Sequence, residues 1–493
     1  MVYDMNIGKE KFKIEKVGHI GIGKCIWIAV VFYLIYVLCT GTLQYWCSKS
    51  VSKTFASSVS TSDFYRDTIC TDRVALVEYP GESFDARIHI LDEAEERIDI
   101  SYYAMHMGES TDLFLGTLLE AADSGVHIRI LVDGQFGGLT SYHRAYATAL
   151  GAHPNIELKT YNPPSILKPW TWNGRLHDKY IIIDDRLLLM GGRNIGDKYF
   201  APEGYDKSLS YDRDVLLYNT AYSSDDADSV LFDVRDYMDS IWDSESVYEP
   251  FLKDTNRGVK KRQELQMVYE QFRLENPNLF NHMEDDYEAW TYPANCVTFF
   301  HNDMQTGPKE PKTGYILGQL LMDANESVVL QSPYIILDDK LEELLKDLGE
   351  KQIDARILTN SMGTSPNPVA CTAYFGDRKT ILKTGISLWE YQGINSIHAK
   401  TYLIDDRMAV VGSYNLDPRS AYIDTEMMLA IDSADFAQHL KQVQAEYLSD
   451  SLMVDADGNY LPNQSTKAIE TPVLKKIMFF VLFPLVQFFK YLT

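Results

Sequence analysis

Two short stretches of the chain combine residue types that can carry out displacement at a phosphodiester. An imidazole can attack phosphorus, while ammonium and amide donors hold the phosphate oxygens as their charge rearranges. An isolated His-x-Lys is most often an ordinary surface strand. Here a much longer pattern occurs twice, as His177, Lys179, Asp184, Gly191, Gly192 and Asn194, and again as His398, Lys400, Asp405, Gly412, Ser413 and Asn415.

Each copy has the pattern of a β-hairpin. Side chains two apart on a strand share a face, so His177 and Lys179 point the same way, and the apolar residues after them favour a strand. The polar residues from Asp184 to Arg186 predict a turn, with a returning strand after it. The hairpin should therefore bring Asn194 beside His177, and Asp184 should fix the turn. The same spacing in the second copy predicts that Asn415 returns to His398.

The surrounding sequence repeats as well. An amphipathic helix followed by an apolar strand is predicted over 88–104 and again over 317–335, with a second such unit over 119–134 and 345–361. The order of elements is the same in both halves. The sequence predicts an α/β fold of two tandem halves related by a pseudo-two-fold axis, with the two motifs forming one shared site.

Composition limits the classes of function. The chain has 493 residues and 45% hydrophobic residues, enough for two domains with their own cores. A net charge of −24 argues against a surface that binds nucleic acid, although a small basic pocket remains compatible with it. No Asp, Glu, His or Cys residues have metal-ligand spacing, so no metal and no other cofactor is expected.

The N-terminal region predicts a membrane anchor. Residues 25–45 form an apolar run without charged residues, about as long as the ~20 residues that a spanning helix needs. The alternative is a cleaved signal peptide, but the bulky residues 44–47 make a poor cleavage site. Lysines are more frequent before the run than after it, which predicts a cytoplasmic N-terminus at 1–24 and an extracytoplasmic remainder.

The rest of the chain divides by composition. We expect a juxtamembrane linker at 46–78, a first domain at 79–250, a connecting segment at 251–293 and a second domain at 294–449. The tail at 450–493 contains a short apolar segment, 477–489, flanked by lysines. It is typical of an interfacial segment, and its alternative is an element packed on the second domain.

The extended motifs resemble those of the phospholipase D superfamily and, within it, the C-type bacterial cardiolipin synthases. Gly191–Phe200 and Gly412–Ser420 carry the closest resemblance, which covers about 79–449. It implies a catalytic set of His177, Lys179, Asp184, Asn194, His398, Lys400, Asp405 and Asn415, with Gly192 and Ser413 in support. It also implies a phosphohistidine on one histidine, favouring His177, with His398 as the general acid and base.

The same resemblance implies an acidic partner for each imidazole, and the candidates are Asp214 and Glu426. Arg193, Arg213 and Arg419 are candidates for binding lipid phosphate, although arginines at such positions are as often solvated. Tyr102, Tyr103 and Tyr334 end strands that should reach the same cleft.

Four functions fit these features to different degrees. Phosphatidyl transfer to phosphatidylglycerol, with phosphatidylglycerol or phosphatidylethanolamine as donor, is favoured by the membrane segments and the motif extensions. A phospholipase D would use water in place of the lipid alcohol. An endonuclease is disfavoured by the acidic charge and the membrane attachment, so no nucleic-acid partner is expected, and a scaffold with an inactive site is disfavoured by two complete motifs. The sequence does not predict an oligomeric state.

Overall fold

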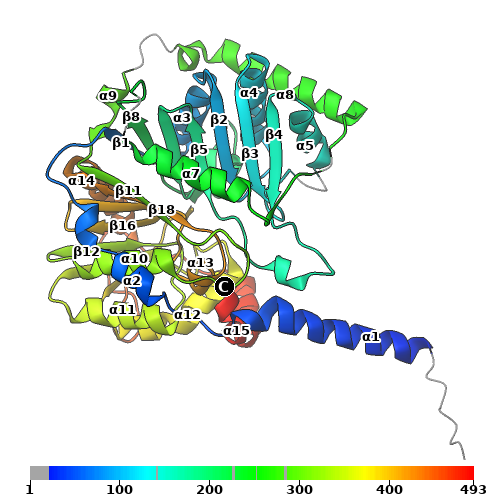
Figure 1. Ribbon diagram of the computed structural model, residues 1–493. Coiled ribbons are helices and arrows are strands. Elements are labelled where there is room, and N and C mark those ends of the chain that lie inside the picture. The colour runs from blue at the N-terminus through cyan, green and yellow to red at the C-terminus, as the bar shows by residue number, and fades with distance from the viewer. Residues whose placement is uncertain (1–21, 140–142, 225–227, 251, 282–285) are drawn as a thin grey trace, which may run out of the picture.

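The computed structural model describes residues 22–139, 143–224, 228–250, 252–281 and 286–493. It contains two mixed β-sheets, one in each half of the chain, stacked with helices between and outside them (Figure 1). Most of the predicted cytoplasmic segment, residues 1–21, lies outside the described residues. Of the lysines that precede the apolar run, the structure describes Lys24 alone.

The first sheet has the strand order β10-β1-β8-β6-β5-β2-β3-β4-β9. Its strands are β1 (Asp72–Val77), β2 (Arg97–Tyr102), β3 (His127–Asp133), β4 (Ile156–Tyr161), β5 (Lys179–Ile183), β6 (Leu187–Gly191), β8 (Asp214–Asn219), β9 (Val247–Tyr248) and β10 (Tyr292–Pro293). Its helices are α3 (Pro80–Asp92), α4 (Glu109–Asp123), α5 (Arg144–Gly151), α6 (Asp197–Phe200), α7 (Val230–Trp242), α8 (Asn256–Glu275) and α9 (Tyr287–Trp290).

The second sheet has the order β11-β18-β17-β16-β12-β13-β14-β19. Its strands are β11 (Cys296–His301), β12 (Ser327–Gln331), β13 (Asp354–Asn360), β14 (Ser387–Tyr391), β16 (Lys400–Ile404), β17 (Met408–Gly412), β18 (Met427–Asp432) and β19 (Ser451–Met453). Its helices are α10 (Lys312–Met322), α11 (Asp339–Glu350), α12 (Pro368–Leu382), α13 (Pro418–Tyr422) and α14 (Ala434–Ser449).

The two sheets are topological copies. Apart from the added edge strand β10, each strand of the first sheet has its counterpart at the same place in the second, from β1 and β11 at one edge to β9 and β19 at the other. β1 and β19 lie in the sheets, so the sheets extend beyond the predicted domain limits of 79 and 449. The short strands were missed because strands of three to six residues with mixed polarity give a weak period-two signal.

A shared core holds the halves together. One hydrophobic cluster mixes strand residues of both sheets, such as Val215 and Leu217 with Val411 and Leu429, and adds the apolar faces of α7 and α14. In Figure 1 these two helices lie between the sheets. Burying one such side chain contributes about 1.5–3 kcal/mol, and the cluster contains many of them. The two halves therefore share a hydrophobic core and are not loosely tethered domains.

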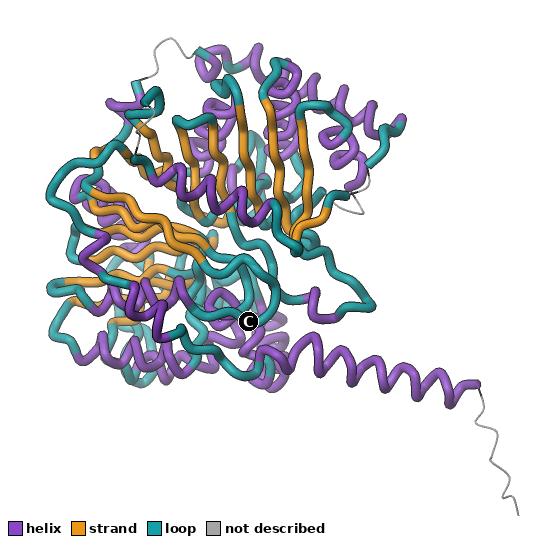
Figure 2. The backbone as a smooth tube through the Cα atoms, viewed as in Figure 1, coloured by secondary structure: helices purple, strands orange, loops and turns teal. Residues whose placement is uncertain are grey.

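The first described element is α1 (Ile22–Val37), which continues through a π-helical segment, η1 (Leu38–Thr42), and a 3-10 helix, η2 (Leu43–Tyr45). The whole stretch Ile22–Tyr45 is long and apolar enough to cross a membrane, and it projects away from both sheets (Figures 1 and 2).

The stretch predicted as a linker is ordered instead: β1 lies in the first sheet, and residues 49–64 pack on the second half. After α2 (Lys53–Ser58) and η3 (Thr61–Phe64), the buried Phe64 lies edge-on to Phe300 at 6.0 Å. The Nζ of Lys340 donates hydrogen bonds to the carbonyl of Lys49 (2.7 Å) and to Ser50 Oγ (3.0 Å). The serine-rich composition suggested a solvated linker, but its few aromatic residues are enough to anchor it.

The tail forms a helix, α15 (Val473–Phe488), that packs on α12 through Phe479 and Val486. The opposite side leaves Phe480 and Val481 exposed. α15 and η8 (Lys490–Leu492) meet the end of the N-terminal span, where Trp46 lies 5.7 Å from Phe488 and 5.1 Å from Tyr491. The alternative of a packed element is therefore correct for one face, while the other face keeps the character of an interfacial helix.

Candidate active site

Both predicted hairpins are present. β5 pairs with β6 in the register Ile183↔Leu187, and β16 pairs with β17 in the register Ile404↔Met408. The turns place Asp184 and Asp405 at positive φ (48° and 49°), a conformation that aspartate tolerates better than most residues.

These two aspartates stabilise the turns and lie away from the histidines. The carboxylate of Asp184 accepts backbone N–H bonds from Glu95, Glu96 and Arg97 at 2.7–3.0 Å. The carboxylate of Asp405 accepts the equivalent bonds from residues 325–327. Each aspartate lies at the opposite end of its strand from the motif lysine. The turn role expected from the hairpin is confirmed, and these contacts assign Asp184 and Asp405 to the turns rather than to the surroundings of the imidazoles.

The imidazole of His177 is held by the second half of the chain. Its Nδ1 lies 3.0 Å from Oε1 of Glu426, the residue immediately before β18. Glu426 also accepts a hydrogen bond from Ser413 Oγ. The backbone N–H of His177 donates to Thr425 Oγ1 at 2.9 Å. With Nδ1 held, Nε2 is the nitrogen left to react.

His398 is held by the first half in the same way. Its Nδ1 lies 2.5 Å from Oδ2 of Asp212, and its backbone N–H donates to the Tyr211 carbonyl at 2.6 Å. The strands β7 (Ser210–Tyr211) and β15 (Ser396–Ile397) pair in parallel and form this crossing. Each imidazole therefore depends on a carboxylate from the opposite half.

The structure corrects Asp214 as a candidate partner. Asp214 is buried among Arg87, Arg193 and Ser83 and makes no contact with either imidazole. The register explains the error, because Gly191 pairs with Asp214 and Gly412 pairs with Met428. Asp212, two residues earlier, is thus the equivalent of Glu426.

Gly192 leaves room for this carboxylate. A Cβ on Gly192 would lie 2.3 Å from Oδ1 of Asp212. The equivalent position in the second half is Ser413, whose hydroxyl donates to Glu426. The two copies thus differ at this position: one has space for a carboxylate, and the other has a donor to one.

The two motif lysines share the site. Lys179 and Lys400 are both buried, and each donates to the carbonyl of its own motif histidine. Lys400 Nζ also lies 2.9 Å from His398 Nδ1. Since that nitrogen already donates its proton to Asp212, the contact with Lys400 is electrostatic rather than a second hydrogen bond.

Burial shifts the ionisation of these groups. Desolvation and the neighbouring charge of Lys400 lower the pKa of His398 to about 4, and desolvation with the charge of Lys179 lowers the pKa of His177 well below its usual value. Desolvation likewise lowers the pKa of Lys179 to about 7, despite the nearby Glu426. A phosphate anion entering the site would reverse the penalty on the lysines.

The two carboxylates differ in charge. Burial raises the pKa of Glu426 to about 8, although Lys179 opposes this shift. Burial also acts to raise the pKa of Asp212, but Lys400 and His398 more than offset it and hold that pKa below its usual value. At neutral pH the pair Asp212–His398 therefore contains a carboxylate, and the pair Glu426–His177 contains a largely protonated carboxyl group.

The amides follow the hairpins as expected. Asn194 and Asn415 come three residues after the returning strands end at Gly191 and Gly412, so each returns toward the end of its strand that carries the His/Lys pair. The amide of Asn194 donates to Tyr199 at 3.1 Å and that of Asn415 donates to Ser420 at 3.3 Å. The Oδ1 atoms of both are buried without a hydrogen-bond partner in the described structure. These amides border the site, with free acceptors.

The candidate arginines have other partners. Arg193 is fully buried and bonds Asp214 at 3.0 Å, and Arg213 is buried and bonds Glu78 at 2.6 Å. Neither is available to a lipid phosphate. Arg419 is paired with Asp424 at 3.1 Å and with Asn173 at 3.0 Å, so it links the two halves beside the site.

The candidate tyrosines also differ in their positions, and one of them lies in the site. Tyr103 lies 4.9 Å from the ring of His177 and 5.1 Å from the ammonium of Lys179, so it lines the site. Tyr102 is a core residue, whose hydroxyl accepts a bond from Arg87 at 3.2 Å. Tyr334 packs partly buried against the second core.

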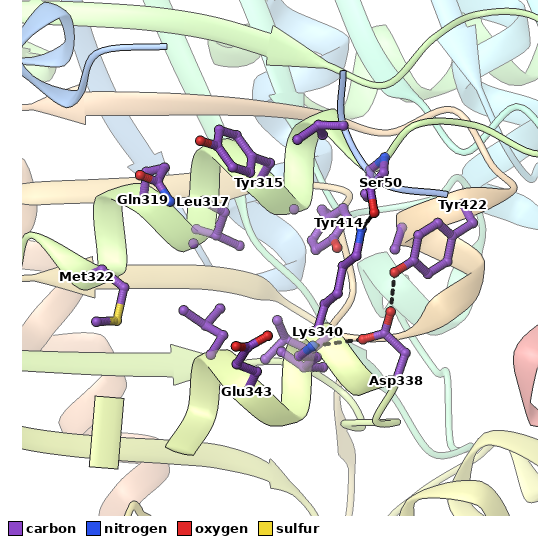
Figure 3. A pocket seen from close by; sticks show the side chains of 18 of the residues that line it. Ser50, Tyr315, Leu317, Gln319, Met322, Asp338, Lys340, Glu343, Tyr414 and Tyr422 are labelled. Carbon is purple, nitrogen blue, oxygen red and sulfur yellow. Dashed lines mark hydrogen bonds between the residues drawn. The ribbon is translucent and has the colours of Figure 1, made fainter. Parts of the chain in front are cut away.

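A cavity of about 400 Å³ lies elsewhere, between α10 and α11 (Figure 3). Tyr422 donates a hydrogen bond to Asp338 at its edge, and Lys340 there reaches Ser50. No motif histidine or lysine lines it. Ser50 and Val51 of the juxtamembrane stretch line it, so it lies where that stretch packs on the second half.

Known families contain the same pair of halves. Residues 88–225 and 317–447 match the family described as "Cardiolipin synthase, PLD-like domain", and together these matches cover more than half of the chain. The chain belongs to this family. The matched ranges include both motifs of the phospholipase D-like domain and both carboxylates, whereas the N-terminal span and α15 lie outside them.

Similarities to single proteins agree with this family assignment. Cardiolipin synthase C of Escherichia coli (strain K12) is 29% identical over 441 residues, covering 80% of this chain and 89% of the relative. A cardiolipin synthase of Oceanobacillus iheyensis is 26% identical over 345 residues, covering 70% of this chain and 62% of the relative. The crystal structure of phosphatidylserine synthase from Haemophilus influenzae Rd KW20 superposes with a TM-score of 0.60 at 14% identity, over 85% of this chain and 95% of that one. That structural likeness supports the fold of the phospholipase D-like domains.

Proposed function

We propose that this chain is a phosphatidyltransferase that makes cardiolipin from phosphatidylglycerol. The observation that carries the proposal is the crossed pair of imidazoles. His177 and His398 come from different halves, each is oriented by a carboxylate of the other half, and Lys179 and Lys400 are buried beside them. The family and the relatives named cardiolipin synthase support a phospholipid as the substrate.

In the proposed reaction, Nε2 of His177 attacks the phosphorus of a phosphatidyl donor. The bond from phosphorus to the headgroup oxygen breaks, and protonated His398 gives its proton to that oxygen. The hydroxyl of an incoming phosphatidylglycerol then gives a proton to His398 and attacks the phosphohistidine, which releases neutral His177. Lys179 and Lys400 donate to the phosphate oxygens, together with the second N–H of the Nδ2 group of Asn194 and of Asn415, since each Nδ2 uses one N–H for Tyr199 or Ser420.

The unequal carboxylates support this division of roles. A nucleophile must be neutral, and a largely protonated Glu426 gives little stabilisation to an imidazolium at His177. An ionised Asp212 raises the pKa of His398 against the lowering by burial and Lys400, so among the described groups it favours the protonated form that a general acid needs.

The lysine distribution supports an extracytoplasmic site. Five lysines, at 9, 11, 13, 16 and 24, precede the charge-free run that starts at residue 25, and only Lys49 and Lys53 follow it closely, so the positive-inside bias favours a cytoplasmic N-terminus. Labelling of a cysteine introduced near the N-terminus by an impermeant reagent tests this orientation. Labelling only after the membrane is opened supports it, and labelling of intact cells contradicts it.

The activity is tested by incubating the purified chain with phosphatidylglycerol, with and without phosphatidylethanolamine, and separating the lipids by thin-layer chromatography. We expect cardiolipin together with free glycerol or ethanolamine. Phosphatidic acid alone would instead identify a hydrolase. Unchanged lipid with degraded plasmid DNA would identify a nuclease and refute both lipid activities.

A further inference from the structure

The loop between β4 and β5, residues 163–172, carries more exposed apolar surface than a water-facing loop should. Ile166 is 72% exposed and Leu167 is 80% exposed, and they are followed by the half-exposed Trp170 and Trp172 on η5 (Pro169–Trp172). Exposed apolar groups clustered in this way mark a surface that contacts a partner or a membrane.

This loop lies along α1. The hydroxyl of Tyr33 donates to the carbonyl of Ile166 at 2.8 Å, and the hydroxyl of Tyr36 donates to the carbonyl of Leu167 at 3.0 Å. The rings of Tyr36 and Trp170 meet edge to face at 6.5 Å. In Figure 2 the loop and its short helix extend from the first sheet beside α1.

The contact is made deep in the apolar span. Tyr33 lies twelve residues before Tyr45, the end of that span, so at 1.5 Å per residue the contact is about 18 Å along the helix. The hydrocarbon core of a bilayer is ~30 Å thick. If α1 crosses the bilayer, the tip of the loop is at the depth of the acyl chains.

We propose that residues 163–172 insert into the bilayer that α1 crosses, with the acyl chains as their partner. An unpaired backbone group in hydrocarbon costs several kcal/mol, so a non-helical loop enters more readily when its carbonyls are paired, and three carbonyls of the exposed tip are. Tyr33 and Tyr36 bond two of its carbonyls. Trp172 Nε1 bonds a third, that of Ser165, at 2.8 Å. The exposed Lys168 has a long side chain that can extend its ammonium toward the headgroups.

The loop is tied closely to the active site. The amide of Asn162 donates to three carbonyls of the loop's returning end, at 171, 173 and 174. Three residues further on is His177. Insertion would therefore place the mouth of the site at the membrane surface, where a lipid phosphate can reach His177 without leaving the bilayer. This role rests on the proposed function, whereas the insertion itself does not.

A depth measurement tests the insertion without any turnover. In the full chain, the exposed Cys25, Cys39 and Cys47 and the half-buried Cys70 are replaced by serine, and an environment-sensitive fluorophore is attached through Leu167→Cys. The matched control is Leu274→Cys on α8, a leucine of nearly equal exposure (78%) far from α1 (Figure 1). Both are reconstituted in phosphatidylglycerol/phosphatidylcholine vesicles.

We expect nitroxide groups on the acyl chains to quench the Leu167 probe at least about twofold more than the Leu274 probe, and aqueous iodide to do the reverse, because only the first probe lies in the hydrocarbon. Equal quenching of both probes by iodide would overturn the proposal, and so would protection of the Leu167 probe from both quenchers, which would indicate a protein partner. An enzyme without lipid activity but with a deeply quenched Leu167 probe would sink the proposed function and leave the insertion standing.

The tyrosines provide a second measurement. Replacing Tyr33 and Tyr36 with phenylalanine removes the two donors and keeps the rings. We therefore expect iodide to quench the Leu167 probe more strongly, and the acyl-chain nitroxides to quench it less. A probe that stays equally deep would refute the claim that these hydroxyls hold the loop in the bilayer.

Discussion

At the scale of single residues, the site depends on which acid meets which histidine. Asp212 and Asp214 are both acidic, both buried and two residues apart, yet only Asp212 reaches His398. Asp214 instead neutralises Arg87 and Arg193. The same residue type thus has a role in chemistry at one position and in stability at the other.

These roles predict opposite effects for two matched substitutions. Asp212→Asn should lower kcat by about 10³–10⁴-fold with little loss of stability, because the imidazole loses the carboxylate that fixes its tautomer and stabilises its proton. Asp214→Asn should lower the melting temperature and leave the turnover of the folded fraction near that of the parent, because it leaves buried arginines unpaired. Turnover and thermal unfolding are measured on both, and equal kinetic losses would contradict the assignment.

Glu426 predicts a pH dependence of stability. Its pKa is about 8 in the folded protein against an ordinary 4.5. The folded state therefore binds one more proton than the unfolded chain between these values, so this group's contribution to the free energy of unfolding falls as the pH rises from 4.5 to 8. The slope is at most about 1.4 kcal/mol per pH unit.

Glu426→Gln should remove this slope. Unfolding of parent and variant is compared at pH 5, 6, 7 and 8, and the stability of the parent relative to the variant should decrease with pH. A difference that stays constant over this range would show that Glu426 is already ionised at pH 5.

Much of the residue set could be predicted from the sequence, since spacing indicated the two histidines and the two lysines, and the family resemblance added Glu426 as a candidate. Asp212 was missed because the first half has an additional segment, 202–210, after its motif, which obscures the alignment of the two halves; the pairing of Gly191 with Asp214 now defines the register. Arg193 and Arg213 were misassigned because their partners, Asp214 and Glu78, are 21 and 135 residues away in the chain. A sequence shows that a charge is present but not which opposite charge it meets.

At the scale of elements, the two hairpins position the motif histidines and lysines, and the aspartates in their turns stabilise the hairpins. The order of strands and helices was predictable because the repeat shows it twice. The crossing of β7 to β15 was not, since two residues of strand leave no periodic signal and the pairing joins residues 186 positions apart.

Substitutions of Asp405 in the turn between β16 and β17 should lower stability and leave the turnover of the folded protein unchanged. Asp405→Ala removes the acceptor of three backbone N–H groups and should cost about 1–3 kcal/mol. Asp405→Asn keeps one acceptor oxygen and tolerates the positive φ of 49°, so it should cost less. Chemical denaturation measures both, and a fall in the turnover of the folded alanine variant would restore Asp405 to the catalytic set.

At the scale of the whole molecule, the halves share one core and one site. His177→Ala and His398→Ala should each abolish turnover, and the double variant should be no worse than either, because residues that act as a unit are not additive. Mixing the two single variants should restore nothing, since each chain carries both halves of its own site. Activity regained on mixing would show instead that the site is assembled between two chains.

The crossed carboxylates also have a consequence for biosynthesis. Glu426 and Asp212 pair with histidines that lie 249 and 186 residues away, so during synthesis His177 emerges from the ribosome long before its partner exists. We expect the nascent chain to be tethered to the membrane by its N-terminal span while still chemically inert. The enzyme would become able to act on the surrounding lipids only when nearly all of it has been made and folded.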